Sequence, residues 1–183
     1  IIRATLLIEL SGAALLAPVF CRDFGPIRGL WMAVFHSISA FCNAGFDLIG
    51  IRSPFSSLTT YASQPVINLT IMALIIVGGI GFLTWEDVKR NRLHFSRYRM
   101  QSKVILVTTA VLIAAPAAWF FFFEFSELPL GTRLLSALFQ SVTPRTAGFN
   151  TADLTKMTEA GQMLMIVLML CGGSPGSPAG GMK

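Results

Sequence analysis

The stretches FHSISAFCNAGF (35–46) and FQSVTPRTAGFNT (139–151) are two copies of one pattern. In each copy an apolar segment ends in a polar turn that contains Ala-Gly-Phe, at residues 44–46 and again 103 positions later at 147–149. Ordered matches at a constant displacement indicate an internal repeat rather than chance. The matches before the turn are displaced by 104 positions and pair Leu30 with Leu134, Ala33 with Ala137, Phe35 with Phe139 and Ser37 with Ser141.

Apolar blocks of helix length flank both copies. Residues 66–83 and 104–123 are long enough to cross a bilayer, because a hydrocarbon core of ~30 Å needs about 20 helical residues. Residues 4–20 form a shorter apolar block, and residues 162–171 form half a span. The two copies lie between these blocks and are too short and too polar to span, so we expect each to be a re-entrant segment.

Charge is sparse and concentrated. Only 13% of the 183 residues are charged, against roughly 25% in soluble domains. A basic connector between two apolar blocks is typical of a cytoplasmic face, so we expect residues 84–103 in the cytoplasm and both re-entrant loops open to the outside. This distribution argues against a nucleic-acid partner despite the net charge of +5. Six of the 14 basic residues lie in the connector: Lys89, Arg90, Arg92, Arg97, Arg99 and Lys103.

The sequence therefore predicts an all-α integral membrane protein of the cell membrane, crossing it several times. Residues 1–88 form one helix–pore loop–helix unit, residues 89–103 the connector, and residues 104–183 a following unit. Both ends resemble cuts in a longer protein. Three scattered cysteines and two distant histidines support neither a disulfide framework nor a zinc site, and no nucleophile–base pair predicts an enzyme.

The two turns predict ion-binding chemistry. Non-helical backbone at membrane depth is tolerated only where protein buries it or where it lines a watery cavity, and carbonyl oxygens can replace the hydration shell of K⁺. Gly45 and Gly148 have the conformational freedom that such a turn requires, and Asn43 and Thr146 add polar side chains beside it. The alternative is that each Ala-Gly-Phe is an ordinary helix C-cap.

A glycine-rich run follows residues 162–171, and its Gly172-Gly173 matches Gly78-Gly79. Two prolines within the run, Pro175 and Pro178, exclude a regular helix and favour an unwound segment at mid-bilayer depth over a small-residue packing strip. Lys183 is either a connector charge or a partner of this segment. At the second turn we expect Arg145 to lie behind the loop or at the outer rim, bonded to carbonyl groups.

These motifs resemble the Trk/Ktr/HKT potassium transporters. Residues 35–46 resemble the second pore loop of that superfamily, residues 139–151 the third, and GGSPGSPAGGMK (172–183) the third-repeat intramembrane loop, closest to the bacterial Ktr membrane subunit. The resemblance implies four repeats around one pore, of which this chain holds the second and most of the third. It also implies a homodimer gated by a cytosolic nucleotide-binding ring.

By the same resemblance, this chain takes part in K⁺ uptake by conduction, with K⁺ as the transported ion and no bound cofactor. The alternatives are a sodium-coupled or sodium-conducting carrier, and a scaffold or intramembrane enzyme. Departures at Cys42 and at Ser177-Pro178-Ala179 leave the gating kinetics open. The implied filter residues are Asn43, Ala44, Gly45, Thr146, Ala147 and Gly148, and the implied gate residues are Gly172, Gly173, Ser174, Pro175, Gly176, Ser177, Gly180 and Gly181.

Overall fold

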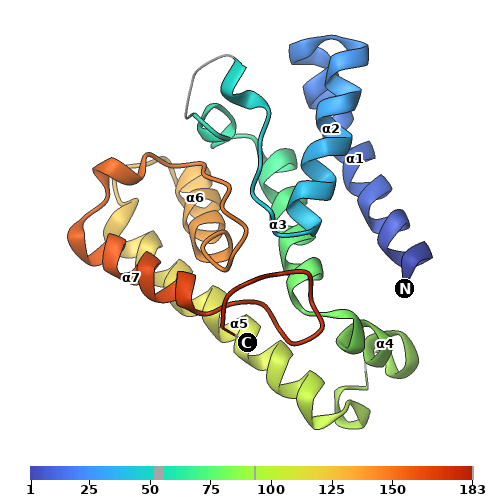
Figure 1. The fold of residues 1–183 in the computed structure, drawn as a ribbon. Coiled ribbons are helices and arrows are strands. Elements are labelled where there is room, and N and C mark those ends of the chain that lie inside the picture. The colour runs from blue at the N-terminus through green and yellow to red at the C-terminus, as the bar shows by residue number, and fades with distance from the viewer. Residues whose placement is uncertain (52–55, 93, 183) are drawn as a thin grey trace.

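The computed structural model describes residues 1–51, 56–92 and 94–182, and Figure 1 shows their arrangement. All regular elements in these ranges are helical, which confirms the all-α prediction. The helices form two units of the same order along the chain, α1–α2–α3 and α5–α6–α7, with α4 between them. Lys183, whose role the sequence left open, lies outside the described residues.

The first unit consists of α1 (Ile2–Phe24), α2 (Pro26–Phe41) and α3 (Pro65–Gly79). α1 and α2 pack side by side as a hairpin (Figure 1). The hairpin turns at Gly25, whose φ of 84° suits glycine, and Pro26 then begins α2 at a position where its missing N–H costs nothing. Short 3₁₀ turns at Ile49–Ile51 and Thr59–Tyr61 connect α2 to α3.

The second unit consists of α5 (Met100–Trp119), α6 (Leu130–Val142) and α7 (Glu159–Leu170). A π-helical turn, Phe120–Glu124, continues α5 just after Pro116. The Glu124 carboxylate accepts hydrogen bonds from the backbone N–H and the hydroxyl of Thr158, both at 2.8 Å. Since Thr158 is the N-cap residue of α7, these bonds join the π-helical turn that ends α5 to the start of α7.

The helices include membrane spans. α1 and Met100–Glu124 are each long and apolar enough to cross a bilayer, and the bent pair of α3 and α4 (Phe82–Asn91) would be a third. Apolar side chains that include Leu7 and Leu10 on α1 and Val107 and Val111 on α5 are exposed. Exposed apolar rows on helices of this length are what a lipid-facing surface requires.

The sequence misplaced one span. The prediction of a continuous helix over residues 66–83 is wrong, because α3 ends at Gly79 and the chain bends by 97° into α4. Gly81 permits the bend with a φ of 82°. The helices of the two re-entrant segments, α2 and α6, have 16 and 13 residues.

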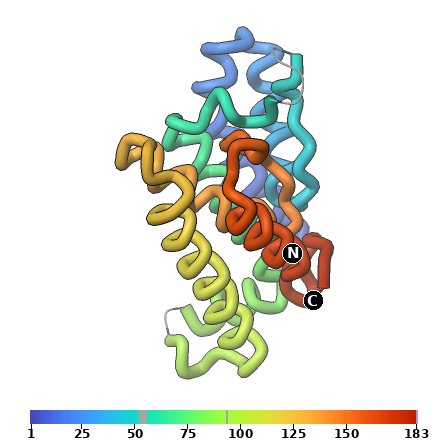
Figure 2. Tube along the Cα trace, turned by 90° about the vertical axis from the view of Figure 1, so that its left-hand side faces the viewer, coloured from blue at the N-terminus to red at the C-terminus, as the bar shows by residue number. Residues whose placement is uncertain are grey.

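A buried acid organises the connector. Asp87 on α4 accepts hydrogen bonds from the Ser102 hydroxyl at 2.6 Å and the Arg99 backbone N–H at 3.1 Å, and Arg99 also forms an ion pair with it. These contacts attach the beginning of α5 to α4. Figure 2 shows the two helices meeting at the end of the molecule away from the outer loops.

We predict that Asp87→Ala in the full-length protein loosens the connector, because Arg99 and Ser102 lose their shared acceptor. Limited trypsin digestion should then cleave after Arg97 or Arg99 several times faster than in the wild type. Glu86→Ala is the matched control, since Glu86 is the exposed neighbour on the same helix. Equal cleavage rates for Asp87→Ala and the wild type would contradict this assignment.

Candidate functional site

The two glycine turns adopt the same backbone conformation. Asn43 and Gly45 have φ values of 52° and 71°, and Thr146 and Gly148 have 72° and 84°. Positive φ is uncommon for non-glycine residues, so its occurrence at Asn43 and Thr146 is a specific feature. Asn43 and Thr146 are 103 positions apart, and so are Gly45 and Gly148. The repeat seen in the sequence is therefore also present in the backbone φ angles.

The carbonyl groups of these turns are free of protein donors. No hydrogen bond within the described ranges uses the carbonyl oxygens of residues 43–45 or 146–148. The C-terminal carbonyls of α2 and α6 accept instead: Ser39 O accepts from the Ala44 N–H, and Thr143 O from the N–H groups of Ala147 and Gly148. Asn43 and Ala147 are buried, where a carbonyl normally has a partner, so these two sets of three free carbonyls favour an external ligand over simple helix capping.

The two turns face each other. A methyl group added to Gly45 would overlap the carbonyl oxygen of Ala147, whereas one added to Gly148 would lie 3.7 Å from the Gly45 Cα. The oxygen of Ala147 therefore points toward the first turn. The filter residues predicted from the sequence come together in space, although 103 residues separate the two sets.

Hydroxyl groups hold the chain where it leaves each turn. Ser39 on α2 donates to the carbonyl of Phe46 at 2.8 Å, and Thr143 at the end of α6 donates to the carbonyl of Phe149. Ser39 and Thr143 are 104 positions apart and Phe46 and Phe149 are 103 positions apart, so the two contacts occupy equivalent positions in the repeat. Sequence reasoning missed them, although the Ser-to-Thr match was visible at a displacement of 104.

The glycine-rich run forms a closed loop below the turns. It begins after α7 and folds back on itself, with the Gly172 N–H donating to Met182 O at 3.0 Å and the Gly173 N–H to Gly180 O at 3.2 Å. A Cβ on Gly181 would lie 3.1 Å from the Thr146 side chain, which places the second half of the loop next to the second turn.

This loop is attached to the break between α3 and α4. Both the N–H and the hydroxyl of Ser174 donate to Gly79 O, at 2.9 and 3.0 Å, and the Phe82 N–H donates to Gly176 O at 3.2 Å. In Figure 1 the loop is the red segment beside the lower end of α3. The matched glycine pairs 78–79 and 172–173 are thus neighbours in the structure.

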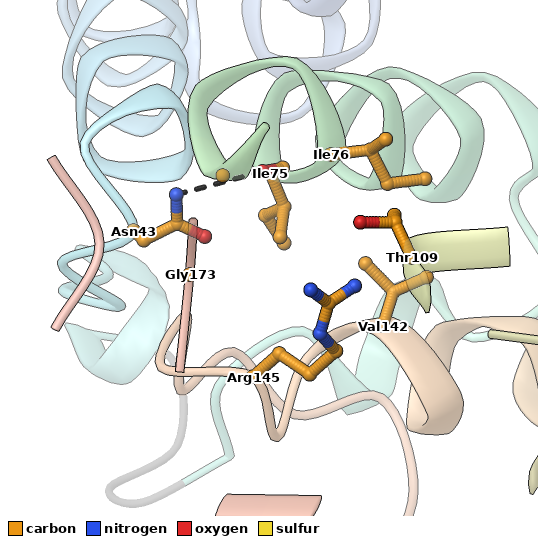
Figure 3. Close-up of a pocket in the computed structure, with 8 residues that line it drawn as sticks. Asn43, Ile75, Ile76, Thr109, Val142, Arg145 and Gly173 are labelled. Carbon is orange, nitrogen blue, oxygen red and sulfur yellow. Dashed lines mark hydrogen bonds between the residues drawn. The ribbon is translucent and has the colours of Figure 1, made fainter. Parts of the chain in front are cut away.

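Arg145 lies behind the second turn. Its side chain lines a small cavity with Asn43, Thr109 and Gly173 (Figure 3). It also lines a larger pocket of about 320 Å³ between α5 and the glycine-rich loop. The predicted bonds to carbonyl groups are absent: Nε is buried without a partner among the described residues.

The polar side chains of the turns are partly unpaired. The Asn43 amide donates to Ile75 O at 3.5 Å (Figure 3), while its buried Oδ1 has no partner in the part of the chain that is described. Thr146 Oγ1 is likewise buried without a partner among the described residues.

Two carboxylates follow the turns along the chain. Asp47 Oδ1 accepts from the Ile49 N–H, which fixes it near the first turn. In the second unit, the hydroxyl and then the N–H of Thr155 donate to Asp153 and hold its pKa below the ordinary value, so it is ionised at neutral pH. Asp153 is exposed and pairs with Lys156, which offsets its charge.

With this geometry described, the chain can be compared with known proteins. Residues 5–183 match the model of the TrkH family, described as cation transport proteins. The chain belongs to this family. It is a multi-pass protein of the cell membrane, and its family consists of transporters, not enzymes.

Its relatives are longer proteins. The potassium/sodium uptake protein NtpJ of Enterococcus hirae is 40% identical over the whole chain, which covers 40% of that relative. The Ktr system potassium uptake protein B of Vibrio alginolyticus is 36% identical over 100% of the chain and 41% of its own length. The protein of the same name from Bacillus subtilis is 37% identical over 96% of the chain and 40% of its own length. The chain thus spans about two fifths of these relatives.

The contrast between the two glycines yields a prediction. Alanine at either position incurs the left-handed backbone penalty of ~1–2 kcal/mol, but only at Gly45 does the new methyl group also displace the opposite turn. Gly45→Ala should therefore lower the unfolding temperature of the detergent-solubilised full-length protein more than Gly148→Ala.

The control for this comparison is Gly131→Ala on α6, where an added Cβ meets no atom within 4 Å. We expect its unfolding temperature to stay at or above that of the wild type, since alanine is the better helix former. Equal losses for Gly45→Ala and Gly148→Ala would contradict the contact between the turns.

Proposed function

We propose that this chain forms part of a K⁺ uptake pathway in which the carbonyl oxygens of residues 43–45 and 146–148 coordinate the dehydrated ion. The proposal rests on the matched pair of turns, which have no protein donor to their carbonyls among the described residues and lie against each other, with Ala147 O pointing toward the first turn. Carbonyl dipoles in such an array replace the hydration shell of the ion, and the ion supplies the partner that these oxygens otherwise lack.

The rest of the pathway would come from parts of the protein beyond this chain. Four carbonyl-bearing turns around one axis are proposed for the complete pore, together with a homodimer and a cytosolic nucleotide-binding ring as regulator. The relatives named as Ktr system proteins support a transporter that works as a component of a larger system. In that assembly the basic connector faces the cytosolic side.

Substitution of Gly148 tests the filter. Gly148→Ser in the full-length protein forces a side chain into a left-handed position at φ 84°, and the strain of ~1–2 kcal/mol should turn the neighbouring carbonyls away from the ion. We expect the preference for K⁺ over Na⁺ to fall about tenfold, since 1.4 kcal/mol is a factor of ten. The measurement is K⁺ and Na⁺ uptake in a transport-deficient strain; unchanged uptake and selectivity would overturn the filter proposal.

A sodium-linked transporter is the second candidate, because the NtpJ relative is named a potassium/sodium uptake protein. The two candidates differ in coupling. Conduction of K⁺ should persist in proteoliposomes without Na⁺ and follow the K⁺ gradient alone, whereas a coupled carrier requires both ions in a fixed ratio.

We further propose that the loop of residues 172–182 is the gate beneath the filter. Its bonds to Gly79 and Phe82 hold it against the break between α3 and α4, and they are few enough to break and reform. Gly176 and Gly181, with φ values of 76° and 78°, give the loop its turns.

Ser174→Ala removes one of the two bonds to Gly79 O. A net loss of about 1 kcal/mol should shift the loop several-fold toward release and raise the K⁺ uptake rate by a similar factor. Ser11→Ala is the control, since the Ser11 hydroxyl donates to Ile8 O within α1. A Ser174→Ala rate equal to that of the control would argue against a gating contact.

A further inference from the structure

His36 is a completely buried histidine that the proposed ion chemistry does not use. It lies on α2 with an exposed fraction of 0%. Its ring contacts the rings of Phe20, at a centroid distance of 5.1 Å, and of Phe149, at 6.3 Å. Phe149 directly follows the second turn, so His36 of the first unit packs against the exit of the second unit's filter.

The hydrogen bonds of His36 assign its tautomer. Nδ1 lies 2.7 Å from Met32 O, which can only accept, so Nδ1 carries the proton. Nε2 lies 3.3 Å from the backbone nitrogen of Leu48, which can only donate, so Nε2 must be an unprotonated acceptor. The arrangement requires a neutral imidazole, and protonation of Nε2 would place two N–H groups against each other.

Leu48 belongs to the chain that leaves the first turn, three residues after Gly45. This exit is held at two points on α2: Ser39 binds the Phe46 carbonyl and His36 binds the Leu48 N–H. The two α2 residues are three apart and lie on one face of the helix. We call these two hydrogen bonds the exit contacts.

The second unit has equivalent contacts with different chemistry. Thr143 binds the Phe149 carbonyl, and Gln140, displaced by 104 from His36, donates from Nε2 to Asn150 Oδ1 at 2.9 Å. Gln140 is also fully buried. Both units thus use the same helix position to hold the filter exit, but only the residue in the first unit titrates.

We propose that neutral His36 is a positioning residue for the first filter turn, and that its protonation releases the Leu48 contact and lowers ion selectivity. The inference rests on the proposed filter. Loss of the contact frees the chain between Phe46 and Leu48, and the carbonyls of Ala44 and Gly45 lose their fixed direction. The second turn keeps its geometry, because the Gln140 amide does not titrate.

The charged groups around His36 are few. Asp47, on the exit itself, interacts electrostatically with the ring. Asp23, at the end of α1, binds the hydroxyl of Tyr61, whose ring packs on Phe20. Arg145, on the second turn, lines the cavity beside Asn43. Burial among Phe20, Phe35 and Phe149 opposes protonation of His36 most strongly by excluding water, whereas the Met32 carbonyl and Asp47 favour it.

The test measures K⁺ and Na⁺ uptake by the full-length protein in proteoliposomes at neutral and at acidic pH. The wild type should lose selectivity by about three- to tenfold on acidification, the range expected for one hydrogen bond. His36→Phe, which lacks the acceptor, should be poorly selective at both pH values. His36→Gln places an acceptor near Leu48 as a non-titrating amide and should have the same selectivity at both.

His94→Gln, in the connector, is the matched control and should retain the acid response of the wild type. A wild-type selectivity for His36→Phe at both pH values would overturn the proposal. So would an acid response of His36→Gln equal to that of the wild type, and this variant decides the question if His36→Phe does not fold. Gly148→Ser in the same assay separates the hypotheses: if it alters selectivity while the His36 variants do not, only the His36 inference fails.

Discussion

The structure depends on the requirement that carbonyl groups at membrane depth have a partner. Lipid offers none, so a backbone that leaves the helical conformation must be satisfied by protein, by water or by an ion. In this chain α2 and α6 end next to each other, and the turns that follow leave the oxygens of residues 43–45 and 146–148 without a donor among the described residues. The remaining features of the fold hold those oxygens in place.

Three sets of contacts do this. Hydroxyls at the ends of α2 and α6 bind the carbonyls of Phe46 and Phe149, so the chain leaves each turn in a fixed direction. A shared apolar core that includes Phe20, Phe41, Phe139 and Phe149 joins the two units behind the turns. Below them, the glycine-rich loop is bound to Gly79 by two hydrogen bonds from Ser174. The two turns are thus held by the hydroxyls and the apolar core, and the glycine-rich loop lies next to them.

The sequence predicted the parts of this arrangement that repeat. Matches at displacements of 104 and 103 located α2, α6 and both glycine turns, because equal residues in equal units adopt equal backbones. Features that depend on contacts between residues far apart in the sequence were missed or wrong. The break at Gly79 depends on Ser174, 95 positions away, and the cap of α7 depends on Glu124, 34 positions from Thr158. Such long-range pairs leave no periodic signal, and the filter and gate residues themselves stay predictions.

The central claim is that an ion occupies the space between the two turns. Crystals of the full-length protein grown with Rb⁺ in place of K⁺ would test it by anomalous scattering, which locates the heavier ion. We expect anomalous peaks between Gly45 and Gly148, within coordination distance of the carbonyl oxygens of both turns. Rb⁺ bound elsewhere, with those oxygens hydrogen-bonded to protein donors, would contradict it.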